Sequence, residues 1–385
     1  MNMTRRGLLG AGLAAAPLML VPGIALAGAK TDKRFVMIIL RGAMDGLNVV
    51  APVGDPGYKA ARGGLAIDAP ATIGGLFALH PALVETGKMF GAGEALFVQA
   101  VASPYRDRSH FDGQNVLETG GTNPYEYKDG WLNRLLPLLP AGQRALALAP
   151  AVPPILRGRV AVESYAPSNL PQANNDLLAR VGAMYEPDRL LHPLWEEAMD
   201  ARRTAGMTPG AVGGAARNLP GLATLAAQFL VKPNGARIAV LEYDGWDTHS
   251  GQQGRLANQL KGLDAALAAL KAGLGPEWSN TVVLAATEFG RTVQANGTGG
   301  TDHGTASVAI LAGGGVAGGR VIADWPGLAM GALYEARDLK PTADLRSVLL
   351  AASAAHMGVD PRRAARALFP DAPVPRAMMN VLRAA

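Results

Sequence analysis

The sequence contains no cysteine among its 385 residues. This absence excludes a disulfide framework, a thiolate nucleophile and a cysteine-ligated zinc site, so any metal must be held by His, Asp, Glu and hydroxyl groups. A large surplus of positive charge is missing as well, because the formal net charge is only +5 and the basic residues are scattered. The composition therefore gives no reason to expect a nucleic-acid-binding protein.

Other signatures are absent too. There is no Gly-x-Ser-x-Gly elbow, so a serine esterase lacks support. Beyond the N-terminal segment no apolar stretch is long and uninterrupted enough to span a membrane, and no internal repeat is visible. Hydrophobic residues make up 49 % of the chain, enough to bury a large core in one large α/β domain or two smaller ones.

The N-terminus carries a pair of arginines, Arg5 and Arg6, followed by an apolar stretch that ends in Ala25-Leu26-Ala27. This order is typical of a twin-arginine export signal with a small-residue cleavage site. An uncleaved membrane anchor is the alternative, which the prolines and glycines of the stretch disfavour. We expect residues 1–27 to be the signal and residues 28–385 the mature α/β domain, in the periplasm or outside the cell. The twin-arginine export machinery would be one partner, and because it carries folded proteins, a metal or a co-exported protein would be acquired first.

Five continuous apolar runs have the length of β-strands: residues 35–40, 95–101, 237–241, 281–286 and 306–311. Runs of this kind, rather than alternating ones, are typical of strands covered on both faces. Between them, residues 251–274 repeat leucine every three to four positions and predict a helix that ends at Gly275-Pro276. The alternation predicts an α/β fold, with a doubly wound, mostly parallel sheet flanked by helices.

The segment from about residue 124 to residue 220 is less regular. Its helical stretches are repeatedly interrupted by proline and by polar turns. Two interpretations stay open: a helical cap or insertion over the active face, or ordinary peripheral helices of the same domain.

Two groups of acidic and histidine side chains flank the expected strands. Asp244, Asp247 and His249 follow the strand 237–241, and Asp302 and His303 precede the strand 306–311. At the edge of an α/β sheet such groups present oxygen and imidazole ligands to a divalent metal. Each group alone could be an acidic residue in a turn beside a histidine with ordinary hydrogen-bond partners. The convergence of both groups on one edge of the sheet favours a metal site. A metal-dependent hydrolase is therefore the first hypothesis.

Two further positions belong to segments that follow strands. Asp45 comes after the first strand, where open α/β sheets bind ligands, although an Asp-Gly pair also forms turns. Ser109 stands where a helix is expected to begin. A hydroxyl there is either a nucleophile supported by the helix dipole or a plain N-cap.

Two arginines near these segments are candidates for holding an anion. Arg106 precedes Ser109, and Arg291 follows Glu288 after the strand 281–286. A surface arginine is the alternative for the first, and a structural Glu288–Arg291 ion pair is the alternative for the second.

In combination these motifs resemble the exported family of unknown function number 1501, which is similar to the alkaline phosphatase and sulfatase superfamily. The motifs that carry the resemblance are Arg41–Asn48, Ser103–Asp112, Asp244–His249, Thr287–Thr292 and Asp302–Gly304. The resemblance covers essentially the whole mature chain and implies an alkaline-phosphatase-like fold. It implies that one divalent metal, whether zinc, calcium, magnesium or manganese, is surrounded by Asp45, Ser109, Asp302 and His303. A second would be held by Asp247 and His249, with Asp244 as a further candidate.

The chain departs from that pattern in two ways. The only later histidine, His356, lies in a run typical of a packed helix, so a complete second metal site lacks a ligand. Sulfatases form their aldehyde cofactor from Cys, or from Ser in a Ser-x-Pro-x-Arg context. Here there is no Cys, and Ser103-Pro104-Tyr105-Arg106 has a different spacing.

We therefore expect an exported, metal-dependent hydrolase of small anionic esters, phosphate esters before sulfate esters. Ser109, or else Ser103, would be the nucleophile, and Arg106, Arg291 or Arg41 would hold the anion. The rival hypothesis is a catalytically silent exported binding or assembly protein that keeps the fold and acts with a co-exported partner.

Overall fold

The computed structural model describes residues 32–68, 70–167, 175–206, 218–373 and 380–383. The expected export signal lies outside the described residues. Among the helices that are described, none has both the length and the apolar composition needed to cross a membrane.

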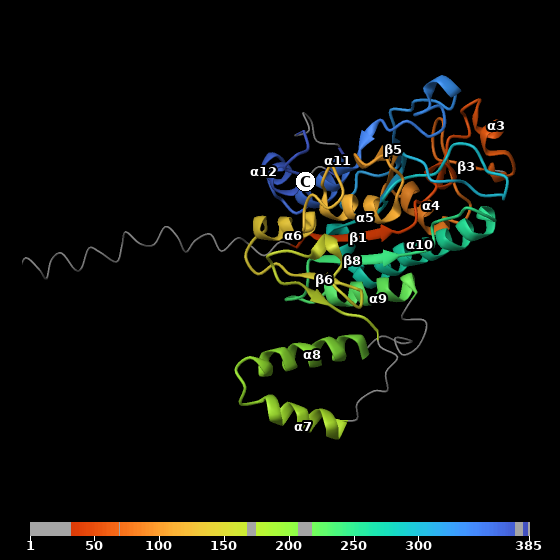
Figure 1. Cartoon of the computed structure of the whole chain (residues 1–385). Helices are drawn as coiled ribbons and strands as arrows, with labels where there is room; N and C mark the ends of the chain where they lie inside the picture. The colour runs from red at the N-terminus through yellow and green to blue at the C-terminus, as the bar shows by residue number, and fades with distance from the viewer. Residues whose placement is uncertain (1–31, 69, 168–174, 207–217, 374–379, 384–385) are drawn as a thin grey trace, which may run out of the picture.

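A nine-stranded sheet forms the centre of the molecule (Figure 1), with the order β11-β5-β10-β9-β1-β8-β6-β7 and with β12 paired to β5. The strands are β1 (Arg34–Leu40), β5 (Ala95–Ala102), β6 (Ala145–Ala147), β7 (Glu163–Ser164), β8 (Ile238–Tyr243), β9 (Thr281–Thr287), β10 (Ser307–Ala312), β11 (Arg320–Ile322) and β12 (Ala343–Asp344). All five strands predicted from apolar runs are present. The prediction of a mostly parallel sheet is confirmed, because only β10 runs antiparallel to its neighbours β5 and β9.

Helices cover both faces of this sheet, because successive side chains of a strand point to opposite faces. In β1, Val36, Ile38 and Leu40 belong to one core, and Phe35, Met37 and Ile39 belong to the other. The first core is covered by α4 (Val84–Gly91), α9 (Leu219–Leu230) and α10 (Gln252–Leu274). The second is covered by α5 (His110–Thr119), α6 (Trp131–Leu135), α11 (Leu345–Leu350) and α12 (Pro361–Leu368). The doubly wound α/β fold is thus confirmed, as is the leucine-rich helix.

Short elements complete the body beside the carboxyl end of β1. They are α2 (Gly46–Val49), α3 (Tyr58–Arg62) and a small sheet of β2 (Val50–Ala51), β4 (Ala78–Leu79) and β3 (Ala71–Thr72).

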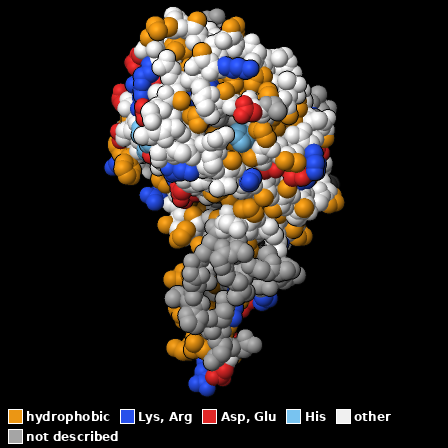
Figure 2. Space-filling view, turned by 90° about the vertical axis from the view of Figure 1, so that its right-hand side faces the viewer, with side chains coloured by type: hydrophobic (Ala, Val, Ile, Leu, Met, Phe, Trp, Pro, Cys, Tyr) orange, Lys and Arg blue, Asp and Glu red, His pale blue; other side chains and the backbone are white. Residues whose placement is uncertain are grey.

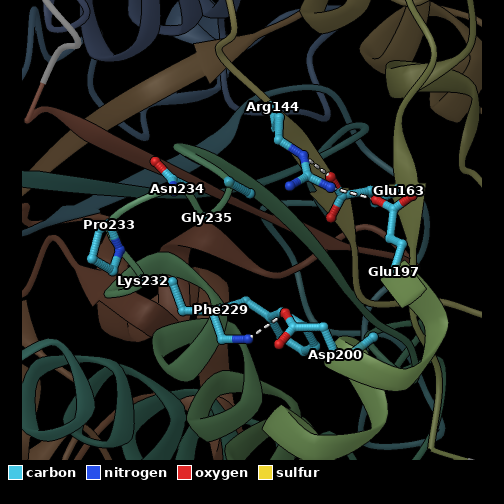
Figure 3. A pocket seen from close by; sticks show the side chains of 11 residues that line it. Arg144, Glu163, Glu197, Asp200, Phe229, Lys232, Pro233, Asn234 and Gly235 are labelled. Carbon is cyan, nitrogen blue, oxygen red and sulfur yellow. Dashed lines mark hydrogen bonds and ion pairs between the residues drawn. The ribbon is translucent and has the colours of Figure 1, made fainter. Parts of the chain in front are cut away.

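A helical hairpin of α7 (Asn175–Tyr185) and α8 (Leu191–Gly206) stands apart from the body in Figure 1, beside α9. Lys232 donates to Asp200 over 2.7 Å, and Arg144 forms an ion pair with Glu197. These pairs line a cavity of about 580 Å³ between α8 and the body (Figure 3). Because Lys232 and Arg144 precede β8 and β6, these ion pairs attach α8 near the amino edge of the sheet.

Candidate metal centre

Five segments of the chain meet at the opposite, carboxyl edge of the sheet. β1, β5, β8 and β9 end there, and β10 begins there because it runs in the reverse direction. This is the side of the molecule that faces the viewer in Figure 2, where histidine side chains appear among acidic and basic ones. A shared edge brings together side chains from distant parts of the sequence.

The side chain of His303 lies at the centre of the candidate site. Its Nε2 lies 2.9 Å from Nε2 of His110, 3.0 Å from Nε2 of His249 and 3.3 Å from Oδ1 of Asp247. Ligand atoms of His110, Asp247 and His303 all lie within 4.8 Å of one another. The fourth side chain, His249, places its Nε2 3.0 Å from Asp247 Oδ1.

The other ring nitrogen of each histidine faces a hydrogen-bond acceptor. Nδ1 of His303 lies 2.9 Å from the carbonyl oxygen of Arg108, and Nδ1 of His110 lies 2.8 Å from Oε1 of Glu288. Nδ1 of His249 lies 3.1 Å from Oδ1 of Asp302. Since only N–H groups donate, these partners assign the proton of each neutral ring to Nδ1.

The three Nε2 atoms therefore turn lone pairs toward one another and toward a carboxylate. Lone pairs cannot satisfy one another by hydrogen bonding, but a cation placed among His110, Asp247 and His303 satisfies these three groups, with His249 beside them. Imidazoles that bind metal through one nitrogen while donating the other N–H to a carboxylate or carbonyl are the usual arrangement of histidine-rich metal sites. These residues thus fit a divalent metal.

The histidine pKa values are shifted in opposite directions. The pKa of His110 is raised, first by its hydrogen bond to Glu288, whereas burial and the neighbouring His110 lower the pKa of His303. Burial opposes ionisation of Glu288, but the hydrogen bond from His110 and others lower its pKa, so a fully buried carboxylate stands behind the cluster. In the protonated form of His110 a second proton is bound at Nε2. A metal bound at this atom would replace that proton.

Arg291 holds the Asp247 carboxylate in place. The buried guanidinium donates from Nη1 to Asp247 Oδ1 over 2.6 Å and from Nε to Thr301 Oγ1 over 3.1 Å. Burial opposes ionisation of Asp247, but Arg291 lowers its pKa. The alternative of a Glu288–Arg291 ion pair was wrong, because Arg291 pairs with Asp247 and Glu288 pairs with His110.

Ser109 occupies the N-cap position of α5 but its side chain makes no capping hydrogen bond. Ser109 is thus the N-cap by position, but the hydrogen bond that the capping interpretation requires is not formed. The residue before it, Arg108, has a positive φ of 61° and forms ion pairs with the buried Asp338 and with Glu335. A left-handed conformation is costly for a residue other than glycine and persists only when its surroundings hold it. In this conformation the carbonyl oxygen of Arg108 lies beside Nδ1 of His303.

Asp45 lies behind the cluster and is not part of it. Its Oδ1 accepts from the backbone N–H of Leu47, and its Oδ2 accepts from Arg62 and Gln252. Gln252 in turn accepts from Thr301 over 2.6 Å, the same hydroxyl that Arg291 contacts. The structure therefore uses Asp45 as a helix cap and buried ion-pair partner that supports the site from within.

The remaining predicted residues lie around the cluster. Asp302 contacts it through His249 and also accepts from Asn296 over 3.1 Å. Asp244 is exposed at its margin. Arg41 forms ion pairs with Glu118 and Glu242, and Arg106 donates to main-chain carbonyls in a separate cavity.

His110 and Glu288 are two residues of the candidate site that the sequence analysis did not propose as part of a metal site. Both were visible as polar residues just after strands, in Ser109-His110 and in Thr287-Glu288. By contrast, His356 is buried as predicted and lies at the amino edge, with Nε2 3.0 Å from the carbonyl of Arg34. It supplies no second metal site.

Comparison with known protein families gives one match. A model of the family described as protein of unknown function (DUF1501) matches residues 94–369. No curated protein matches the chain.

Several solved structures are distantly similar. Ps i-CgsB in complex with k-i-k-neocarrahexaose is 12 % identical, with 86 % of this chain and 73 % of that chain covered and a TM-score of 0.44. The PsFucS1 sulfatase from Pseudoalteromonas sp. is 13 % identical, with 85 % and 68 % covered and a TM-score of 0.41. The alkaline phosphatase of the Antarctic bacterium TAB5 is 12 % identical, with 76 % and 95 % covered and a TM-score of 0.36.

Proposed function

The chain belongs to the DUF1501 family of proteins of unknown function, and from that premise and the geometry above we propose that it is an exported, metal-dependent hydrolase of phosphate esters. The convergence of three imidazole Nε2 atoms and the Asp247 carboxylate carries the proposal. Such a ligand set suits zinc, or a related transition metal, better than calcium or magnesium, which prefer oxygen ligands.

His110, Asp247 and His303 would be the principal ligands, with His249 as the fourth. A bound divalent ion supplies Lewis acidity toward an ester oxygen and lowers the pKa of a coordinated hydroxyl or water. Glu288, Asp302 and the Arg108 carbonyl orient the three imidazoles through their Nδ1–H groups. Arg291 orients the carboxylate.

Ser109 would be the nucleophile. It directly precedes the ligand His110, and its hydroxyl is not used in capping α5. The first turn of a helix leaves backbone N–H groups without intrahelical acceptors, and these favour negative charge near the hydroxyl and on a bound anion. Attack by this hydroxyl would form a phosphoserine and release the alcohol, and water would then regenerate the serine.

One observation favours the rival function, a silent binding protein. Arg41, Arg108 and Arg291, described at this edge of the sheet, each pair with carboxylates of the chain. A phosphatase would normally keep a cation beside the metal for the substrate, and Arg106, which has no carboxylate partner among the described residues, lies in a separate cavity. In the rival case the metal centre is present but serves stability or partner binding.

Metal analysis of the purified protein together with turnover of aryl phosphate and aryl sulfate esters tests the proposal. We expect bound zinc or another transition metal and phosphate ester turnover, both lost in His303→Ala. His192→Ala, on α8, is the matched control and should keep both. Metal without turnover of any ester would favour the silent protein, and absence of both metal and turnover would contradict the proposal.

A further inference from the structure

A second polar cavity lies at the carboxyl end of β5, about 370 Å³ in volume. It is lined by Ala102–Pro104, Arg106, Pro341–Asp344 and Arg346. Arg106 lies four residues before His110, so the two Cα atoms are at most about 14 Å apart even in a fully extended chain. The cavity is therefore a neighbour of the metal centre on the same edge of the sheet.

The charged groups of this cavity leave a surplus of positive charge. Its lining includes two guanidinium groups, Arg106 and Arg346, and one carboxylate, Asp344. Arg346 is neutralised by Asp344 through hydrogen bonds of 2.8 to 3.2 Å. Within the described residues, Arg106 has no carboxylate partner at ion-pair distance. Its Nη1 donates instead to the carbonyls of Ser103 and Tyr105.

Arg106 is also partly removed from water. Burial is the main cause that lowers its pKa, and the charge of Arg346 acts in the same direction. Asp344 and Tyr334 act in the opposite direction on this pKa, but neither forms an ion pair with Arg106. A partly buried guanidinium without an ion-pair partner carries a desolvation cost. An oxyanion in the cavity would offset this cost and bridge the two arginines, and guanidinium forks suit phosphate and sulfate oxygens well.

Two of the residues that line the cavity, Thr342 and Ser103, carry hydroxyl groups. Oγ1 of Thr342 is buried and, within the described ranges, has no hydrogen-bond partner. The backbone of Thr342 is fixed by a 2.9 Å hydrogen bond to the carbonyl of Ala100. The second hydroxyl belongs to the buried Ser103. A buried donor without an acceptor is costly and points to a missing partner.

We propose that this cavity is an oxyanion subsite, in which Arg106, Arg346 and Thr342 bind one phosphate or sulfate group. At about 30 Å³ per water molecule, the volume equals that of about a dozen waters, which is ample for one such group with part of its hydration. The group is either the second anionic group of a substrate or the free inorganic anion. Only the first of these two sources rests on the proposed hydrolase function.

Calorimetric titration of inorganic phosphate and sulfate into chelator-treated protein tests binding without the metal. We expect Arg106→Gln to weaken binding by about tenfold or more, as for loss of one charge-assisted hydrogen bond. Arg362→Gln, an exposed arginine on α12, removes the same charge and should bind like wild type.

The variant Thr342→Val tests whether a loss of anion binding could be caused by misfolding. This change keeps the shape and removes a hydroxyl that contributes no hydrogen bond within the chain, so the melting temperature should not fall while anion binding weakens several-fold. Wild-type anion affinity in both Arg106→Gln and Thr342→Val, or no binding of either anion to wild type, would overturn the subsite.

Kinetics distinguish the two sources of the anion. If the group belongs to the substrate, Arg106→Gln raises KM for an ester with a second phosphate and leaves KM for a simple monoester unchanged. If the ligand is the free anion, both KM values stay unchanged and only the effect of added phosphate on the rate is lost. A protein without any turnover would contradict the hydrolase proposal, while the titrations would still decide the subsite.

Discussion

His110 and Ser109 are adjacent residues to which the proposed function gives separable roles. His110→Ala removes an Nε2 that lies 2.9 Å from His303 Nε2, so we expect metal occupancy to fall. Stability should fall too, by about 3 kcal/mol when wild type is measured with free metal at about 100 times its Kd. Ser109→Ala leaves the imidazoles in place, so metal stays bound while ester turnover drops by orders of magnitude. Elemental analysis and initial rates separate the two effects. Full activity in Ser109→Ala would mean that water or Ser103 is the nucleophile.

Glu288 provides a sharper residue-scale prediction, because its hydrogen bond to the histidine cluster is made to His110, while its other donors are Gly42, Gln114 and Thr287. Glu288→Gln keeps an oxygen acceptor for Nδ1 but removes the buried negative charge, so metal affinity should fall by roughly 10 to 100-fold. Competition with a chromogenic chelator measures this change. Glu242→Gln, which removes a partner of Arg41, is the control and should keep wild-type affinity. Equal affinities in the two variants would remove Glu288 from the site.

Sequence patterns predicted part of this site and missed part of it for a physical reason. Asp247, His249 and His303 were recognisable because they flank strands that are themselves recognisable. The contacts of His110 could not be recognised, because Glu288 is 178 residues away and His303 is 193 residues away. Asp45 was placed in the site because an Asp after a first strand has the same pattern whether it binds metal or caps a helix.

At the scale of elements, apolar runs were enough to predict the long strands but not their direction. A buried antiparallel strand such as β10 has the same composition as a parallel one, since both are covered on two faces. β6 was missed as well, because three residues in a proline-rich segment carry no periodicity. Such short strands form because a neighbour, here β8, supplies the hydrogen bonds.

The α7–α8 hairpin allows a prediction at this scale. Replacing residues 175–206 by a short Gly/Ser linker should leave metal stoichiometry and affinity unchanged, because the ion pairs of α8 are made near the amino edge. A modest loss of stability is expected from the lost contacts with α9. Metal titration and thermal unfolding of the deletion variant test this. Loss of metal binding with an intact fold would show that the hairpin reaches the metal centre.

At the scale of the whole molecule, one buried histidine should couple stability to pH. Burial lowers the pKa of His356 to about 4, while its unfolded value is near 6.5. The unfolded chain therefore binds the proton more tightly, and stability is lost as pH falls from about 6.5 to 4, by ~3 kcal/mol. His356→Gln should flatten this part of the pH dependence of unfolding free energy. An unchanged slope in His356→Gln would contradict the prediction.

Export is the second prediction for the whole molecule, and it falls on residues outside those described. Replacing Arg5 and Arg6 together by Lys keeps the charge but removes the paired arginines that the export machinery recognises. We expect the precursor to stay in the cytoplasm, as measured by cell fractionation. Periplasmic accumulation of the double variant at the wild-type level would show that another signal directs the protein.

The antiparallel direction of β10 has a consequence for the order in which the molecule folds. β9 and β10 are neighbours in both sequence and sheet, so they and the loop with Glu288, Arg291 and His303 form a low-contact-order unit that closes at little entropic cost. His110 follows β5 in the sequence, so it reaches this unit only when β5 pairs with β10, which lies much farther along the chain. The imidazole of His110 can therefore reach the side chains of Asp247 and His303 only after this long-range strand pairing is complete. A single bound metal would then report that β5, β8, β9 and β10 have all taken their places in the sheet.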